Sequence, residues 1–468
     1  MKVARGGVKV SLSPEAKERM AESRRILETR AKKGPVYGFN TGLGKLAEVS
    51  LSPDDLRQFQ LNIIRSHAIG VGEPISLPET RAVMLLRANA LAKGHSGIRP
   101  EVVEFFIEML NQDILPIIPS AGSVGASGDL APLAHMALAL IGEGQVVAGD
   151  RHIPSQIIFR ERGLEPPVLE AREALALING TQFTAGLLAI LIGEALRLVE
   201  AADTVGALSF YATGSRPSQF SPDVMKTRPH PGQLASAANI SALVKDLPEG
   251  GVIQDPYSLR CMPQVHGAAR DGIAFAEKIL SVEINSATDN PLVVGDEVYS
   301  CGNFHGQHLA LAGDILSICL TTLASVSERR TFLLLSGRNG LPQFLASNPG
   351  LESGLMILHV TIASLVSANK SLSHPASVDS IPTSGGQEDI VPMAANAVLA
   401  AREIAGNALI VLAGELVAAV EAIRLSGKKP TGKLGELYEI YLEEVKPGEG
   451  DRFLAPELER ATTLLRNL

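Results

Sequence analysis

Aromatic residues are scarce in this chain of 468 residues. Tryptophan is absent and aromatic residues make up 4% of the sequence, whereas 46% of the residues are hydrophobic and 20% are charged. The apolar residues are therefore mainly aliphatic or small, a composition typical of a globular protein that excludes a disordered one. The length is enough for a large buried core and excludes a small protein held together by disulfides or metal ions.

Blocks of basic charge are also lacking. The 42 Lys and Arg residues and the 50 Asp and Glu residues give a net charge of −8 and are spread along the chain, which argues against nucleic acid as a partner. The three cysteines, Cys261, Cys301 and Cys319, show no CxxC or Cys/His zinc spacing, so we expect no metal site and a reducing, cytoplasmic location. The sequence shows no signal-peptide pattern and no uninterrupted apolar span, so we expect neither a leader nor a membrane helix.

Helical periodicity dominates the sequence, and Gly-Asp turns mark two hairpin-like patterns at 144–154 and 291–300. After Asn303, polar residues from Asp314 to Glu328 recur every three or four residues among aliphatic ones, which predicts a long helix with a narrow polar stripe. Long apolar helices bury their surfaces against one another, and we expect this bundling to extend across subunits. The sequence therefore predicts a mainly α fold, a long-helix bundle with small β ribbons in the N-terminal half. The predicted helices are 14–33, 53–67, 78–93, 100–111, 185–202, 265–284, 303–336, 353–370, 390–410 and 410–425, the last two possible as one helix.

Two glycine-rich loops carry polar residues. The loop 37–45 has glycines like those of a phosphate-binding loop, but it lacks the GxxxxGK[ST] spacing and a preceding apolar strand, so it does not predict a nucleotide site. The loop 120–130 contains Ala126-Ser127-Gly128, where small residues let the backbone fold back on itself. The amide nitrogen of Gly128 could attack the carbonyl of Ala126, and loss of two waters would leave a strong electrophile made from backbone. The alternative is an ordinary Gly/Ser turn that caps the following helix.

The residues around this tripeptide decide between the two interpretations. The segment 122–138 resembles the signature of the aromatic amino acid ammonia-lyases and aminomutases, in which Ala-Ser-Gly becomes the methylidene-imidazolone (MIO) prosthetic group. The resemblance extends over most of the chain through 37–42, 179–182, 254–260, 302–306 and 387–389. Departures from the family pattern are Leu43, Met262, His266 and a short stretch between 232 and 254.

The resemblance implies the helical fold of the aromatic amino acid lyase and fumarase-aspartase-like type. It implies a single lyase unit over residues 1–468, with an N-terminal lobe of about residues 1–200 that carries the cofactor loop and a central helical bundle of about residues 201–468. It further implies a homotetramer in which one active site draws residues from three subunits. No metal is expected, because the cofactor is made from Ala126, Ser127 and Gly128.

The resemblance also implies roles for single residues. Tyr37 corresponds to the base that removes the β-proton, and Arg260 to the residue that pairs with the substrate carboxylate. The residues expected to orient the substrate or to contact the cofactor are Asn179, Gln254, Tyr257 and Phe304. Without the resemblance, a loop tyrosine, an isolated arginine or an asparagine at a helix end would be structural in most proteins.

Two further residues predict the substrate. Ser66-His67 and Glu388 are similar to the histidine-specific branch of the family, where they would bind the imidazole ring. We therefore expect non-oxidative elimination of ammonia from L-histidine to give urocanate. The alternative on the same scaffold is a phenylalanine or tyrosine ammonia-lyase or a 2,3-aminomutase. A non-catalytic helical oligomer is disfavoured because the tripeptide, Tyr37 and Arg260 are all intact.

Overall fold

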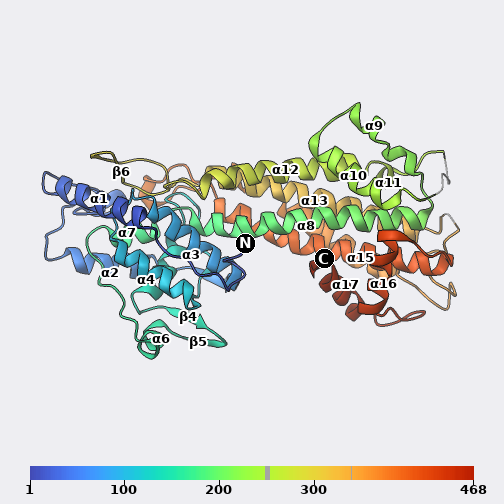
Figure 1. The fold of residues 1–468 in the computed structure, drawn as a ribbon, viewed down its shortest axis with the longest axis horizontal. Coiled ribbons are helices and arrows are strands. Elements are labelled where there is room, and N and C mark those ends of the chain that lie inside the picture. The colour runs from blue at the N-terminus through green and yellow to red at the C-terminus, as the bar shows by residue number, and fades with distance from the viewer. Residues whose placement is uncertain (248–252, 339, 468) are drawn as a thin grey trace. The chain divides into compact units, whose positions relative to one another are not determined.

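The computed structural model describes residues 1–247, 253–338 and 340–467. The chain forms two compact units (Figure 1), and each is built from three separate segments. The first unit contains Met1–Ile190, Glu277–Asp314 and Pro375–Leu399, and the second contains Leu191–Ala276, Ile315–His374 and Ala400–Leu468. The first unit therefore adds two later segments to the N-terminal part of the chain.

The first unit consists of short and medium helices with three small sheets. Its helices begin where the sequence provides start signals: Ser76 caps α3, and Glu79 bonds back to the Ser76 backbone to complete a capping box. Proline lies in the first turn of α1, α3 and α4, where no backbone donor is needed. The complete helices of this unit are α1 (Pro14–Ala31), α2 (Leu56–His67), α3 (Leu77–Ala92), α4 (Pro100–Asn111), α5 (Leu130–Leu140), α6 (Ser155–Arg162) and α7 (Glu173–Ile178).

The sheets of the first unit are all antiparallel. Both predicted hairpins are present, as β4 (Gln145–Ala148) with β5 (Arg151–Pro154), and as β6 (Leu292–Val294) with β7 (Glu297–Tyr299). Two further pairings join segments distant in sequence: β1 (Val71–Pro74) with β3 (Pro119–Ala121), and β2 (Ile114–Pro116) with β4. The β1–β3 pair fixes the start of the loop that contains Ser127.

The second unit is a helical bundle. Four long helices contribute most of it: α8 (Gln182–Thr213), α12 (Met262–Glu283), α13 (Gln307–Leu335) and α15 (Ala394–Ser426). The predicted helices 390–410 and 410–425 are one continuous helix, α15, and the predicted helix 185–202 is the first part of the longer α8. The other α-helices in the described part of this unit are α9 (Pro222–Lys226), α10 (Pro231–Val244), α11 (Tyr257–Arg260), α14 (Met356–Leu372), α16 (Gly432–Glu444) and α17 (Ala455–Asn467).

The polar stripe of α13 is buried. Asp314, Ser317 and Glu328 are each less than 5% exposed. Asp314 accepts hydrogen bonds from the backbone of Ala376 and Ser377 in the first unit, and Glu328 pairs with His359 on α14 in the second. The α13 helix is long and apolar enough to cross a membrane, but 67% of its apolar window is buried inside the protein, as expected of a core helix.

A charged cluster lies inside the bundle. Asp203 on α8 accepts hydrogen bonds from His266 and Arg270 on α12 at 2.8 and 2.7 Å. Arg330 on α13 forms a bidentate pair with Glu415 on α15, and both side chains are fully buried. Since Arg330 also donates to His266, these five residues form one network across four helices, which we call the bundle network. His266, a departure from the family pattern, is thus a structural member of the core.

Candidate active site

The Ala126-Ser127-Gly128 loop leaves β3 and turns back sharply before α5. Gly125 and Gly128 have φ of +73° and +67°, values that glycine adopts without strain. A Cβ at Gly128 would lie 2.3 Å from the Gly180 carbonyl oxygen, so this position needs glycine for space as well. The backbone folds so tightly that Ala126 and Gly128 form a bridge with each other.

Ser127 contacts two of the predicted site residues. The Asn179 Nδ2 donates to the Ser127 carbonyl oxygen at 2.6 Å. The Ser127 hydroxyl donates a short hydrogen bond to the carboxylate of Glu388. Asn179 follows α7 and Glu388 lies in the segment before α15, so the tertiary structure brings together residues 261 positions apart in the chain.

Glu388 sits half-buried in a tight turn. Thr383 and Glu388 pair through their backbones, and the Thr383 hydroxyl donates to the second carboxylate oxygen of Glu388. Burial alone would raise the pKa of Glu388, but hydrogen bonds from Ser127, Thr383 and Ser384 and the charge of His67 outweigh it and lower the pKa. The carboxylate is therefore held ionised beside Ser127 and close to His67.

His67 is the last residue of α2. Its Nδ1 lies 2.7 Å from the Ile63 carbonyl oxygen, which can only accept, so Nδ1 carries a hydrogen. That contact fixes the ring, and among the described residues Nε2 has no hydrogen-bond partner. The structure therefore places the Glu388 carboxylate against the Ser127 hydroxyl, with His67 near enough to act electrostatically on that carboxylate.

Asp129 also belongs to this site, although our sequence analysis did not select it. It is 1% exposed and accepts hydrogen bonds from the Ser123 hydroxyl and from the backbone and hydroxyl of Thr184. Burial raises its pKa, although these hydrogen bonds oppose the shift. Its backbone N–H donates to Gly180 at 2.7 Å, so Asp129 locks the tripeptide loop to the start of α8. An acidic residue directly after Ala-Ser-Gly and before an apolar helix was the available signal.

Tyr37 and Phe304 lie in the same unit as the tripeptide. The Tyr37 hydroxyl accepts from the Gly44 backbone at 3.0 Å, which folds the glycine-rich loop back on itself. Phe304 is half-buried in the segment before α13, and that segment is tied to the tripeptide loop because the Gly306 N–H donates to the Gly125 carbonyl at 3.0 Å. In the described part of the chain, no hydrogen bond joins the Tyr37 hydroxyl to Ser127.

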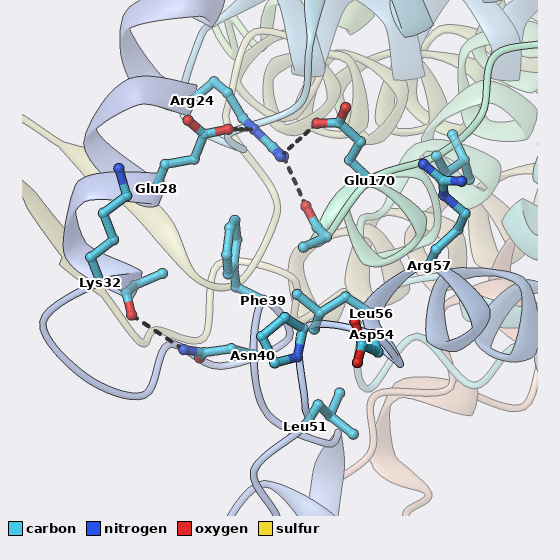
Figure 2. A pocket seen from close by; sticks show the side chains of 14 residues that line it. Arg24, Glu28, Lys32, Phe39, Asn40, Leu51, Asp54, Leu56, Arg57 and Glu170 are labelled. Atoms are coloured by element: carbon cyan, nitrogen blue, oxygen red, sulfur yellow. Dashed lines mark hydrogen bonds and ion pairs between the residues drawn. The ribbon is translucent and has the colours of Figure 1, made fainter.

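The Tyr37 loop also borders a cavity of about 750 Å³ (Figure 2). Phe39 and Asn40 line it, and the Arg24 guanidinium lies 5.5 Å from the centre of the Phe39 ring. Arg24 is bound by Glu28 and Glu170, so the charges on this wall are largely paired. The cavity is therefore distinct from the set of residues that contact Ser127.

Three predicted site residues belong to the second unit. Gln254 is exposed, Tyr257 is 72% exposed, and the Arg260 guanidinium lies 4.9 Å from the centre of the Tyr257 ring. Their segment is fixed by Asp255, which accepts from Arg216 and Gln219, and by Ser258, whose carbonyl accepts from Arg330 of the bundle network. These side chains are thus held on an anchored segment and are open to other molecules.

The fold and the site define a helical lyase, and comparison with known proteins gives its family. A model of the aromatic amino acid lyases matches residues 1–444. Histidine ammonia-lyase of Myxococcus xanthus is 47% identical over 99% of this chain and 94% of its own length. Two solved structures are similar over 99% of this chain. Histidine ammonia-lyase from Trypanosoma cruzi matches over 90% of its own chain, with 39% identity and a TM-score of 0.91. Tyrosine aminomutase from Streptomyces globisporus matches over 94% of its own chain, with 36% identity and a TM-score of 0.94. The chain belongs to the aromatic amino acid lyase family.

Proposed function

We propose that this chain is a histidine ammonia-lyase, which eliminates ammonia from L-histidine and releases urocanate. The observation that carries the proposal is the contact of Glu388 with the Ser127 hydroxyl, together with the electrostatic effect of His67 on Glu388, since a histidine substrate offers two ring nitrogens to such residues. The full-length similarity to proteins named histidine ammonia-lyase, at 46% to 47% identity, supports it.

The tripeptide loop fits the cofactor that the family resemblance implies, MIO formed from Ala126, Ser127 and Gly128 without a metal. Gly128 occupies a turn that excludes a side chain, and Asn179 keeps a buried Oδ1 that has no hydrogen-bond partner in the described part of the chain. Such an orphaned acceptor is unusual and fits a hydrogen-bond donor that the substrate brings, such as its amine. The mature group supplies an electrophile that makes loss of ammonia possible.

The chain's own residues perform the remaining tasks. Asn179 donates to the carbonyl oxygen of Ser127, and Phe304 excludes water from that side of the loop. Tyr37 removes the β-proton of the substrate at its phenol oxygen. Arg260 binds the substrate carboxylate through its planar guanidinium, and Gln254 and Tyr257 orient the substrate. His67 and Glu388 bind the imidazole.

The protein is proposed to act as a cytoplasmic homotetramer whose subunits share their active sites. The α13 and α14 helices of the second unit expose Ile318, Phe332, Ile357 and Val360, each at least 44% accessible. Several exposed large apolar side chains on two helices that contact each other are typical of a subunit interface. In this arrangement Gln254, Tyr257 and Arg260 of one subunit complete the site around Ser127 of another.

Product formation from three substrates tests the proposal. Purified protein is incubated separately with histidine, phenylalanine and tyrosine, and the products are followed by ultraviolet absorbance and chromatography. We expect turnover of histidine to urocanate. The similarity to tyrosine aminomutase makes that reaction the second candidate, and faster conversion of tyrosine or phenylalanine, to an acrylate or to a β-amino acid, would support it instead.

A further inference from the structure

The two contacts of Ser127 involve the two groups that must react when this residue loses water. Dehydration of Ser127 removes the hydrogen on Cα and the hydroxyl on Cβ. Asn179 donates to the carbonyl oxygen next to Cα, and Glu388 contacts the hydroxyl itself. Asn179 thus contacts the carbonyl group that acidifies the Cα hydrogen, and Glu388 contacts the hydroxyl that leaves. Both groups belong to the same elimination.

We propose that Glu388 and Asn179 catalyse the dehydration of Ser127 that completes the cofactor, a role separate from substrate binding. The inference rests on the proposed function, because it requires that the tripeptide matures. It gives Glu388 two tasks at different times: proton transfer during maturation and recognition of the substrate afterwards.

Maturation of the tripeptide releases two water molecules, and every atom of both can be traced. In the first, the Gly128 nitrogen bonds to the Ala126 carbonyl carbon, and that carbonyl oxygen leaves with the amide hydrogens of Gly128 and Ser127. In the second, the Glu388 carboxylate takes the Cα hydrogen of Ser127, and negative charge develops on the carbonyl oxygen that Asn179 holds. The electrons then form the Cα=Cβ bond, the Cβ–Oγ bond breaks, and Glu388 returns its proton to Oγ. Water leaves, and Glu388 is again a carboxylate.

The charge and position of Glu388 suit the first half of that step. Hydrogen bonds lower its pKa despite burial, so it is present as the base. The turn that carries it is fixed at two places: Thr383 bonds to Glu388 through backbone and side chain, and the Lys45 ammonium donates to the Gly385 carbonyl at 3.0 Å. The Cα hydrogen and Oγ are carried by adjacent carbon atoms of one serine, so a single carboxylate can serve both.

The neighbouring carboxylate is less suited to this task. Asp129 follows the tripeptide directly, but it is hydrogen-bonded to Ser123 and twice to Thr184. These contacts turn its oxygens toward Ser123 and the first turn of α8. Asp129 therefore holds the loop in shape, while Glu388 contacts the reacting serine.

Intact mass tests the proposal without any use of substrate. Wild-type protein, Glu388→Gln and Asp389→Asn are made by cell-free synthesis, and mass under denaturing conditions is followed with time. Asp389→Asn is the matched control, because it removes the same charge from the adjacent exposed position. We expect wild type and the control to become two waters lighter than encoded, and Glu388→Gln to retain the second water at least tenfold longer. Loss of both waters from Glu388→Gln at the wild-type rate would overturn the proposal.

Two further measurements separate catalysis from folding. Circular dichroism and particle size establish whether a variant is folded, and Glu388→Ala is then incubated with formate, a small carboxylate that fits the vacated space. We expect formate to restore loss of the second water. A folded variant whose mass is unaffected by formate, while Glu388→Asp is equally inert, would contradict the proposal. Histidine turnover is measured separately, so a mature protein without that activity refutes the proposed function and leaves this inference standing.

Discussion

Ser127 is the residue on which the site converges, because one side chain and one backbone oxygen connect it to Asn179 and Glu388. Replacing Ser127 by alanine removes the hydroxyl that must be eliminated. We expect Ser127→Ala to keep its encoded mass and to lose activity by a factor on the order of 10³ or more. Mass spectrometry and urocanate formation measure the two effects, and a fully active protein with unmodified mass would refute the cofactor assignment.

Substrate choice is also decided at the residue scale. Polar side chains that a bound ligand shields from water reject a ligand that cannot bond to them, at about 1 to 3 kcal/mol per unpaired group. The double variant His67→Leu with Glu388→Gln should therefore show a lower kcat/KM for histidine and a smaller preference for histidine over phenylalanine. Because Glu388→Gln also affects maturation in our proposal, the comparison uses the ratio of the two substrates. An unchanged ratio would show that these residues do not select the ring.

At the scale of helices, the bundle network connects the core to the segment that carries Tyr257 and Arg260. Arg330 is fully buried, pairs with Glu415 and donates to the Ser258 carbonyl at 3.4 Å. A buried charge that loses its partner is costly, which makes this pair sensitive to single substitutions.

We expect Arg330→Met to lower the free energy of unfolding by about 3 to 5 kcal/mol, because it leaves Glu415 charged and unpaired. Adding Glu415→Gln removes that charge and keeps an acceptor for Ser209, which donates to Glu415 at 2.6 Å. The double variant should recover most of the loss. Urea unfolding of the three proteins checks this, and equal losses in single and double variants would contradict it.

The bundle network also predicts a dependence of stability on pH. Arg330 can only donate, so His266 Nε2 accepts and Nδ1–H donates to Asp203. With a hydrogen on Nδ1 alone, the His266 ring is neutral. Burial lowers the pKa of His266, and the charge of Arg330 adds to the effect, while Asp203 opposes it. The unfolded chain then binds the proton more readily than the folded chain, so the stability from this group is present above about pH 6.5 and is lost as the pH falls.

The expected slope is up to about 1.4 kcal/mol of unfolding free energy per pH unit below that value. His266→Gln removes the titrating group and should flatten the profile between about pH 7 and pH 5 relative to wild type. Urea unfolding across this range measures both profiles. Parallel profiles for the two proteins would show that His266 does not control the acid side of the stability curve.

At the scale of the whole molecule, the predicted site residues divide between the two compact units. Tyr37, His67, the tripeptide, Asn179, Phe304 and Glu388 lie in the first, and Gln254, Tyr257 and Arg260 lie in the second. A shared site in a homotetramer predicts that inactive chains complement each other. Co-expressed Ser127→Ala and Arg260→Met chains should regain up to about a quarter of the wild-type sites, the statistical share for random mixing.

Light scattering provides the control for complementation, since the mixed protein and wild type should both have the mass of four chains. A monomeric protein with full activity would refute the shared site. Mixed tetramers without activity would show instead that each chain supplies both Ser127 and Arg260 to its own site.

Sequence alone predicted most of the longer helices and the two hairpins, whereas helices such as α7, α10, α16 and α17 were not predicted. Apolar periodicity and proline or Ser-Glu start signals act over a few residues, and the proposed cyclisation at Ala126-Ser127-Gly128 joins atoms of three neighbouring residues. Residues 277–314 and 375–399 belong to the first unit although they are distant from its N-terminal segment in sequence, and this depends on packing between the segments. Tertiary structure alone therefore brought Glu388 to Ser127 and buried Asp129 against Thr184. It also explains His266, which departs from the family pattern in the sequence and is part of a buried ion-pair network in the structure. The burial and the partners of a side chain depend on residues that only folding brings near it.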